Sequence, residues 1–395
     1  MKDYIYLDHA ATTPVDPRVV EAMLPYFTER FGNPSGVYTL SQSSQGAMEE
    51  AREAVADVLG CSPGEVIFTG GASEADNAAI KGGAFAMRRK GNHLITSAIE
   101  HHAVLHSCQA LDYFGFETTY LGVDAAGLIT PEDAAEAVTG KTVLVTIMLA
   151  NNEVGTIEPV ADISRAVKEK ARALGRDIIV HTDAAQAGGV LDLNVDRLGV
   201  DMLTLAAHKF YGPKGVGILY IRDGTPFTPQ QHGGSQEKNR RAGTENIPLI
   251  VGAAEALRHA VEELGTNNEH CTSLRDRLID GLLGRVDRAY LNGHRTIRLP
   301  NNANFCFDGV AGESVLLGLD MEGIAASSGS ACTSGSMDPS HVLTAMGVSA
   351  ERAVGSLRLT VGKGNDGEEI DKVLEVLPRI IQRLREVSGA AQPVG

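Results

Sequence analysis

The chain has 395 residues, 43% of them hydrophobic and 22% charged, which is typical of a soluble protein with room for a large domain and a smaller one. Acidic residues outnumber basic ones by 50 to 35, and the net charge of −15 argues against general binding to nucleic acids or anionic membranes. No apolar run reaches the ~18 residues of a membrane span, and MKDYIYLDHAATTP at the N-terminus lacks an apolar signal segment.

The five cysteines are widely scattered and odd in number, which disfavours a disulfide framework and favours a reducing cytoplasm. Cys306 lies in the apolar stretch ANFCF, as core cysteines do. Cys332 lies instead in IAASSGSACTSGS, where glycine and serine favour a mobile surface loop. This stretch alone leaves two hypotheses open: a working thiol, or a loop that happens to contain a cysteine.

In chain order, short apolar runs alternate with longer amphipathic segments from about residue 60 to 250. Strands are predicted at 65–71, 93–99, 142–149, 177–184, 201–207 and 215–221, with helices at 73–90, 102–115 and 160–175. Continuous Val/Ile/Leu strands separated by helices indicate a mostly parallel sheet that is covered on both faces. The pattern predicts a three-layer α/β domain.

After about residue 265 the pattern changes, because long helices now alternate with isolated strands. Helices are predicted at 271–286 and 368–387, and strands at 303–309 and 356–362. We therefore predict a large domain at 15–260. A smaller α+β domain is formed by 1–14 together with 261–395, which includes the loop of Cys332.

Polar residues follow most of the predicted strands, at the sheet edge where ligands bind in α/β proteins. Gly70 and Gly71 precede Ser73, at a position typical of a helix N-cap, and such a turn can hold a phosphate. Asn151 and Asn152 follow another strand and can hold a carboxylate or a phenolic oxygen. Ordinary turns use the same residues, so these patterns alone do not decide.

Asp183 and Lys209 each come directly after an apolar strand. A partly desolvated carboxylate at Asp183 needs a cationic partner, unless the residue simply caps a helix. A buried Lys209 has a lowered pKa and can form a Schiff base with an aldehyde, whereas a loop lysine is solvated, as we expect for Lys214. With Gln186 three residues beyond Asp183, these groups suit a pocket for pyridoxal phosphate.

The histidines of EHHAVLH allow two interpretations. His102 and His106 have the i, i+4 spacing of zinc ligands, but HExxH is absent and no third ligand is evident, so no metal site is predicted. His101 follows a strand end, where its ring can contact a bound aromatic group.

Ten motifs then occur in the order of one family. They are LDHAATTPVD, FGNPS, GGASEADN, IEHHAVL, ANNEVG, HTDAAQ, AAHKFYGPKGVG, RRAGTEN, SSGSACTSGS and SLRLTVG. From about residue 4 to 385 the chain resembles the NifS/IscS-type cysteine desulfurases of the class V aminotransferase family, which have the fold type I of enzymes that use pyridoxal phosphate (PLP).

The resemblance implies a role for each matching residue. Lys209, His101 and Cys332 are the implied catalytic residues, with Lys209 carrying PLP and Cys332 as nucleophile. Asn33, Asn152 and Arg358 are the implied substrate-binding residues. Thr244 reaches the phosphate from the second subunit of a homodimer. The cofactor-binding residues are Ala72, Ser73, His101, Asn152, Asp183, Gln186, Ala206, His208, Lys209 and Thr244.

The implied reaction removes sulfur from L-cysteine, leaving L-alanine and a persulfide on Cys332. The sulfur then passes to an iron–sulfur scaffold protein or another acceptor, and a Gly/Ser-rich loop suits a thiol that must serve two places. A selenocysteine lyase or another PLP-dependent C–S lyase is the alternative, and a binding protein without turnover is a third. Ala206 stands where the family often has serine, so one hydrogen bond to the phosphate is expected to be absent.

Overall fold

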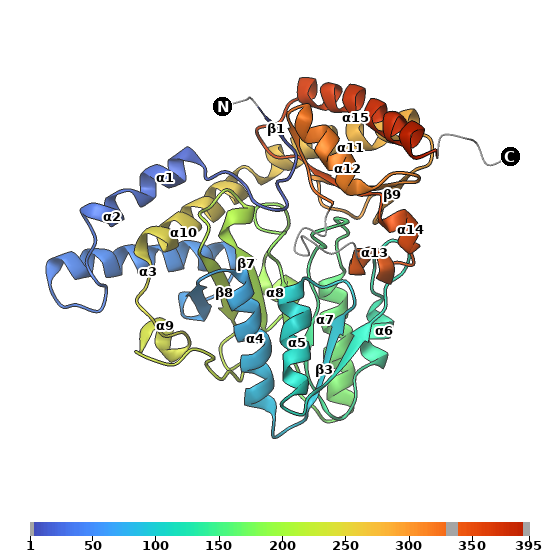
Figure 1. Cartoon of the computed structure of the whole chain (residues 1–395). Coiled ribbons are helices and arrows are strands. Elements are labelled where there is room, and N and C mark those ends of the chain that lie inside the picture. Colours follow the sequence, from blue (N-terminus) through green and yellow to red (C-terminus); the bar gives the residue numbers. More distant parts are fainter. Residues whose placement is uncertain (1–3, 329–338, 390–395) are drawn as a thin grey trace.

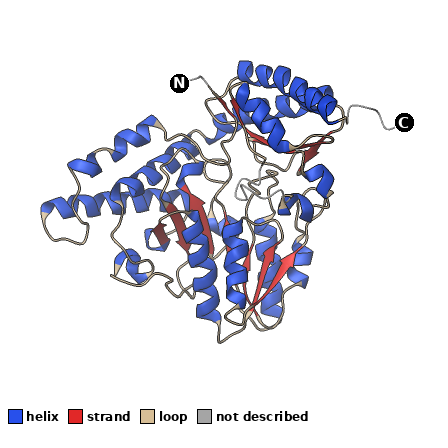
Figure 2. Ribbon diagram, in the orientation of Figure 1, coloured by secondary structure: helices blue, strands red, loops and turns tan. Residues whose placement is uncertain are grey.

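A seven-stranded sheet forms the centre of the larger part of the molecule (Figures 1 and 2). The computed structural model describes residues 4–328 and 339–389. Only the two pairs made by β8 are antiparallel, which confirms the predicted mostly parallel sheet. In spatial order the strands are β2 (Val66–Thr69), β8 (Gly217–Ile221), β7 (Met202–Ala206), β6 (Ile179–Asp183), β5 (Thr142–Thr146), β3 (His93–Ser97) and β4 (Glu117–Leu121).

Helices cover both faces of this sheet, because its strands carry apolar side chains on each face. In β8, Ile218 and Tyr220 join one buried cluster while Leu219 and Ile221 join another. α4 (Ala72–Met87) and α5 (His102–Asp112) cover the second cluster. The first is covered by α3 (Thr39–Leu59), α6 (Pro131–Glu136), α7 (Val160–Ala173) and α10 (Ile247–Glu262), with the short α8 (Val195–Leu198).

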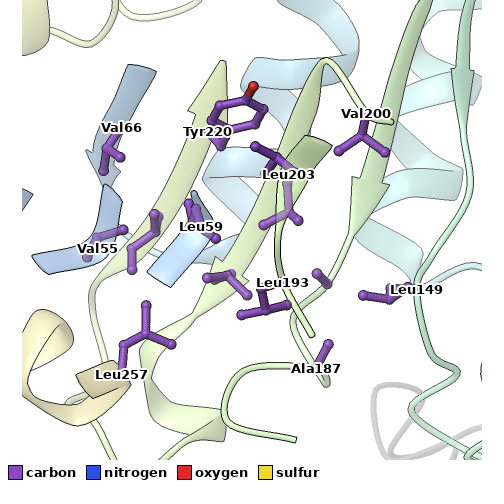
Figure 3. Close-up of a cluster of buried hydrophobic side chains, with 14 of the residues drawn as sticks. Val55, Leu59, Val66, Leu149, Ala187, Leu193, Val200, Leu203, Tyr220 and Leu257 are labelled. Atoms are coloured by element: carbon purple, nitrogen blue, oxygen red, sulfur yellow. The ribbon is translucent and has the colours of Figure 1, made fainter. Parts of the chain in front are cut away.

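The first cluster is the main core of the sheet. In Figure 3, Leu203 and Tyr220 on the strands face the same interior as Val55 and Leu59 of α3 and Leu257 of α10. All five are fully buried. Burying an aliphatic side chain of this size contributes about 1.5–3 kcal/mol, so this core holds the strands, and thus the residues at their ends, in fixed positions.

A smaller group of elements packs at one end of the sheet (Figure 1). β10 (Asn302–Phe307) pairs antiparallel with both β9 (Ala289–Asn292) and β12 (Ser356–Thr360). β1 (Ile5–Tyr6) pairs with β11 (Ile324–Ala325), which brings the N-terminal segment here. The helices of this group are α11 (Leu264–Arg285), α12 (Gly312–Met321), α13 (His341–Ala345), α14 (Ala350–Ala353) and α15 (Gly367–Ser388).

This group has a hydrophobic core of its own. Buried residues of α11, α12, α15, β10 and β12 form a separate cluster, to which Ile5 and Leu7 contribute. The last residue of the main core along the chain is Ala260 of α10, and the smaller core continues from Ile5 and Leu7 at Cys271 of α11. The predicted division into 15–260 and 1–14 with 261–395 stays a prediction, which these two cores support.

The remaining elements are short and flank the main core. α1 (Pro17–Met23) and α2 (Pro25–Thr28) pack near α10. The others are α9 (Gln236–Asn239) and the 3-10 turns η1 (Pro63–Glu65) and η2 (Ala207–Lys209). No helix within 4–328 or 339–389 combines the length and apolar character needed to span a membrane.

Candidate active site

A cavity of about 650 Å³ opens at the C-terminal ends of β2, β5, β6 and β7, between the sheet and the smaller group of elements. Ten of the residues predicted for the site line it: Ala72, Ser73, His101, Asn152, Asp183, Gln186, Ala206, His208, Lys209 and Arg358. Residues spread over almost 290 positions of the sequence therefore meet in one space. The cavity lies at the edge of the sheet where ligand binding was predicted.

The turn between β2 and α4 forms one wall of the cavity. α4 begins at Ala72 with Gly71 as its N-cap, so Ser73 lies in the first turn and the predicted N-cap role of Ser73 is wrong. No side chain of the residues that the structure describes caps this helix, which leaves first-turn N–H groups and the positive end of the helix dipole to bind an anion. The backbone of Gly217 passes so close that a Cβ there would lie 2.4 Å from the carbonyl carbon of Gly71.

Lys209 ends the short turn that follows β7, and its half-buried side chain lines the cavity. Its ammonium group donates hydrogen bonds to the carbonyl oxygens of Ala10 and Ala11, at 2.6 Å each. The N-terminal segment thus holds this amine in place. Asp183, the last residue of β6, is 5% exposed and lines the same cavity.

The electrostatics of Asp183 involve two neighbouring groups. Burial raises the pKa of Asp183, whereas the hydrogen bond from Ala185, the ammonium group of Lys209 and, when protonated, His101 lower it. Its Oδ1 accepts a hydrogen bond from the backbone N–H of Ala185 at 2.9 Å within a turn, so the alternative role as a helix cap is wrong. A carboxylate near an ammonium group at a strand end is a suitable partner for a protonated ring nitrogen.

His101 caps α5, with its Nδ1 accepting a hydrogen bond from the N–H of Ala103 at 3.1 Å. A neutral ring bonded in this way carries its proton on Nε2. Burial is the main cause that lowers the pKa of His101. The preceding Glu100 is fully buried and accepts hydrogen bonds from Ser97 and from the N–H of Met148, which fixes the loop that bears His101.

Arg358 reaches the cavity from β12 of the smaller group. Its Nη1 donates to the carbonyl oxygen of Asn152 at 2.8 Å and its Nη2 to Asp8 Oδ1 at 2.7 Å. Its buried Nε has no hydrogen-bond partner among the residues that the structure describes. The guanidinium is therefore fixed and keeps a donor for a carboxylate. The neighbouring Asn151 is turned inward, because its side chain bonds the backbone of Ile99 and Glu153.

Three further predicted residues complete the lining. Gln186 Nε2 donates to the carbonyl oxygen of Ala10 at 3.0 Å. His208 Nδ1 lies 3.2 Å from the hydroxyl of Thr12, and burial lowers the pKa of His208 to about 4, so its ring is neutral at pH 7. Ala206 lines the cavity and has no side-chain hydroxyl to offer there.

Two of the predicted site residues do not line this cavity. Asn33 and Thr244 line a separate hollow of about 370 Å³, together with Phe31 and Glu245. Thr244 was expected to act from a second subunit, and the roles of both residues stay predictions. Cys332 lies outside the described residues.

The histidine pair of α5 lies beside a third histidine. The rings of His102 and His106 lie 5.0 Å apart, and that of His341 lies 4.7 Å from His102. Within the described ranges, no group of three or more His, Cys, Asp and Glu residues is arranged to hold a metal ion.

Sequence reasoning missed several residues of the lining. Ala10 and Ala11 contribute backbone oxygens that lie almost 200 positions from Lys209, for which the sequence gives no signal. Asp76 also lines the cavity. Its place in the small-residue stretch ASEADNAAIKGGA does not distinguish it from Glu74, so no sequence signal identified it. Lys214, predicted to be solvated, is exposed at the rim.

Comparison with known proteins defines the class. The model of the class V aminotransferase family matches residues 5–373. A solved NifS-like protein superposes with a TM-score of 0.90 at 40% identity, covering 96% of this chain and all of that one. A structure described as SspA in complex with cysteine has a TM-score of 0.80 at 39% identity, covering 91% and 99%. Fold and site together define an enzyme of the class V aminotransferase type.

The similarity of sequence narrows this class. Cysteine desulfurase IscS of Methanosarcina thermophila is 52% identical over 97% of this chain and 93% of its own length. The protein of the same name from Dictyoglomus turgidum is 51% identical over 99% and 98%. The chain therefore belongs to the class V aminotransferase family and, within it, to the cysteine desulfurases of the IscS type.

Proposed function

We propose that this cysteine desulfurase uses PLP bound at Lys209 to take sulfur from L-cysteine, and that Cys332 accepts the sulfur as a persulfide. The observation that carries the proposal is the single cavity in which Lys209, Asp183 and Arg358 meet. An amine, a buried acid and a fixed guanidinium match the aldehyde, the ring nitrogen and the amino-acid carboxylate that this chemistry brings together.

The cavity fits PLP by the donor groups that surround it. The uncapped start of α4 offers N–H groups and a positive dipole to a phosphate at Ala72 and Ser73. Asp183 would hold the ring nitrogen in its protonated form, and Gln186 and Asn152 offer amide donors to the phenolic oxygen. When bound, PLP withdraws electrons from an attached amino acid and so weakens bonds at its α- and β-carbons.

The chain's own residues then bind and orient the substrate. Arg358 is held by Asp8 and the backbone of Asn152, and keeps a donor for the carboxylate of L-cysteine. His101 presents a largely neutral ring near pH 7, since burial lowers its pKa, and is a suitable acceptor for protons released in the cavity.

Cys332 acts on the sulfur atom. Its thiolate attacks the thiol sulfur of L-cysteine, so an S–S bond forms while the C–S bond breaks. The electron pair of the broken bond stays with carbon, and protonation there gives L-alanine. Cys332 keeps the sulfur as a persulfide, and an acceptor such as an iron–sulfur scaffold protein then takes it.

We further propose that the enzyme works as a homodimer in the cytoplasm. The hollow lined by Asn33 and Thr244 offers polar groups outside the cavity of its own chain, which suits delivery to a second copy. The comparisons provide no support for a selenocysteine lyase or another C–S lyase.

A direct test measures alanine and sulfide together after incubation with L-cysteine and a reductant. The wild type should release the two in equal amounts, and Cys332→Ala should release neither. Cys61→Ala is the matched control, because burial raises the pKa of that thiol to about 12 and leaves it unreactive. Full activity of Cys332→Ala would refute the proposed role of the thiol.

The cofactor site has a separate test. Lys209→Ala, treated with PLP and then gel-filtered, should lose the visible absorption that the wild type retains. Cys332→Ala should keep it, because that residue is proposed to act on sulfur and not on cofactor binding.

A further inference from the structure

A second acid, Asp76 of α4, lines the cavity that holds Asp183. Its side chain is 1% exposed, and its buried Oδ1 has no hydrogen-bond partner among the described residues. The only ion-pair contact of Asp76 within 4–328 and 339–389 is with His181, whose Nε2 lies 3.7 Å away. An ionised carboxylate that is buried without a cation is costly. Asp76 would therefore ionise readily only if His181 carried a positive charge.

His181 does not supply this charge. It is fully buried, with Nδ1 2.8 Å from the hydroxyl of Thr146 and Nε2 3.1 Å from that of Thr204. A hydroxyl can donate to one ring nitrogen and accept from the other, so a neutral ring is fully satisfied. Burial also lowers the pKa of His181 to about 3.

The surroundings of Asp183 differ from those of Asp76. The ammonium group of Lys209 stabilises ionised Asp183, as does His101 when it is protonated. Burial is the main cause that raises the pKa of Asp76, and the negative charge of Asp183 acts in the same direction. A hydrogen bond with Thr204 opposes this shift, while Glu100 adds to it only when ionised, since burial raises the pKa of Glu100 to about 8. The other titratable groups around the cavity are Glu74, His208, Lys214 and Arg358, and Glu74 forms an ion pair with Arg241.

We propose that Asp76 is a positioning residue that stays protonated, so that Asp183 carries the only negative charge of this carboxyl pair. The benefit of a protonated Asp76 rests on the proposed function, in which Asp183 holds the proton of the cofactor's ring nitrogen. If both acids ionised, their repulsion would drive a proton onto one of them, and Asp183 would hold the ring less firmly.

The test compares unfolding of the PLP-bound wild type and Asp76→Asn in denaturant between pH 5 and 8. An Asp76 that is protonated when folded and ionised when unfolded releases one proton on unfolding. The ratio of unfolding constants, wild type over variant, should then rise about tenfold per pH unit, so the variant gains relative stability as pH rises. A ratio independent of pH would overturn the proposal, because Asp76 would then be ionised in the fold, for instance by a charged His181.

A second variant separates charge from packing. Asp76→Ala removes the same proton and should show the same pH slope at lower absolute stability, whereas a flat ratio contradicts the proposal. The visible absorption of bound PLP gives an independent readout. Asp76→Asn should leave its pH midpoint unchanged, and a downward shift would mean that a negative charge had been removed. The unfolding test needs no L-cysteine, so its failure is distinct from a failure of the desulfurase proposal.

Discussion

Arg358 Nη2 donates a hydrogen bond to Asp8 Oδ1 across 2.7 Å, which joins two segments 350 positions apart in the sequence. Asp8 comes just after β1, and its backbone bridges to Thr360 at the end of β12. Asp8 fixes the plane of the guanidinium. The N–H group of Nε has no hydrogen-bond partner among the residues that the structure describes. Substrate binding should therefore depend on the shape of this group as well as its charge.

Arg358→Lys should lower kcat/KM for L-cysteine by roughly tenfold to 150-fold, chiefly through KM. A lysine keeps the charge but cannot bond Asp8, Asn152 and a carboxylate in one plane, and one lost charged hydrogen bond costs about 1.5–3 kcal/mol. Steady-state kinetics with a fixed saturating level of PLP measure the effect. An unchanged KM would show that the carboxylate binds elsewhere.

Gly217→Ala should weaken PLP binding and destabilise the fold by about 1–3 kcal/mol. The added Cβ would lie 2.4 Å from the backbone of Gly71 and so push against the start of α4. Titration with PLP and thermal melting measure the two effects. Gly46→Ala on α3 is the control, because its Cβ would meet no atom of the described residues within 4 Å, and it should stabilise the helix. Equal behaviour of the two variants would contradict the argument.

Asp16 links the two parts of the molecule, and its contribution to the free energy of unfolding should decrease at acid pH. Arg18 at 2.7 Å and Lys363 at 2.6 Å hold the pKa of Asp16 well below its usual range. Since the folded pKa is depressed, the contribution is present above pH ~4 and disappears as pH falls through the folded pKa. Asp16→Asn keeps the N-cap of α1 and should cost about 1–2 kcal/mol at pH 7 and less at pH 3.

Denaturant unfolding of wild type and Asp16→Asn at both pH values measures this difference. The contributions of the other acid-titrating groups cancel in this difference, because the two proteins share those groups. A difference that grew on acidification would have the wrong sign for an ion-paired aspartate.

Glu237→Gln should destabilise the protein by about 3–5 kcal/mol. Its carboxylate bonds the buried guanidinium of Arg52 at 2.8 and 3.1 Å, and the amide would leave that charge unbalanced. Glu375→Gln is the control, since its pair with Arg379 on α15 is largely exposed and should contribute less than about 1 kcal/mol. Urea unfolding that gave similar losses for both would refute this reasoning.

The strands and the residues at their ends were largely predictable from the sequence. Asp183 ends the apolar strand β6 and Lys209 lies in the short turn after β7, so sheet topology alone places them at one edge. Boundaries were less accurate: α11 begins at Leu264, seven residues before the predicted start, because its first two turns are polar. α3 and β4 were not predicted, and β4 is an edge strand with mostly exposed or half-buried residues.

What the sequence could not show is contact between distant segments. The carbonyl groups of Ala10 and Ala11 that hold Lys209 carry no side-chain signal. Asp76 resembles any helix acid until the sheet and α4 enclose it. The place of Arg358 beside Asn152 arises from packing of the two cores, which no local pattern encodes.

The most direct test of the account is the mass of the protein after brief exposure to L-cysteine without reductant. The wild type should gain sulfur, and peptide analysis should place it on the peptide that contains Cys332, with alanine formed in step. Cys332→Ala should gain none, and Cys61→Ala should behave as the wild type. Alanine formed without sulfur on Cys332, or sulfur bound to another cysteine, would contradict the central claim.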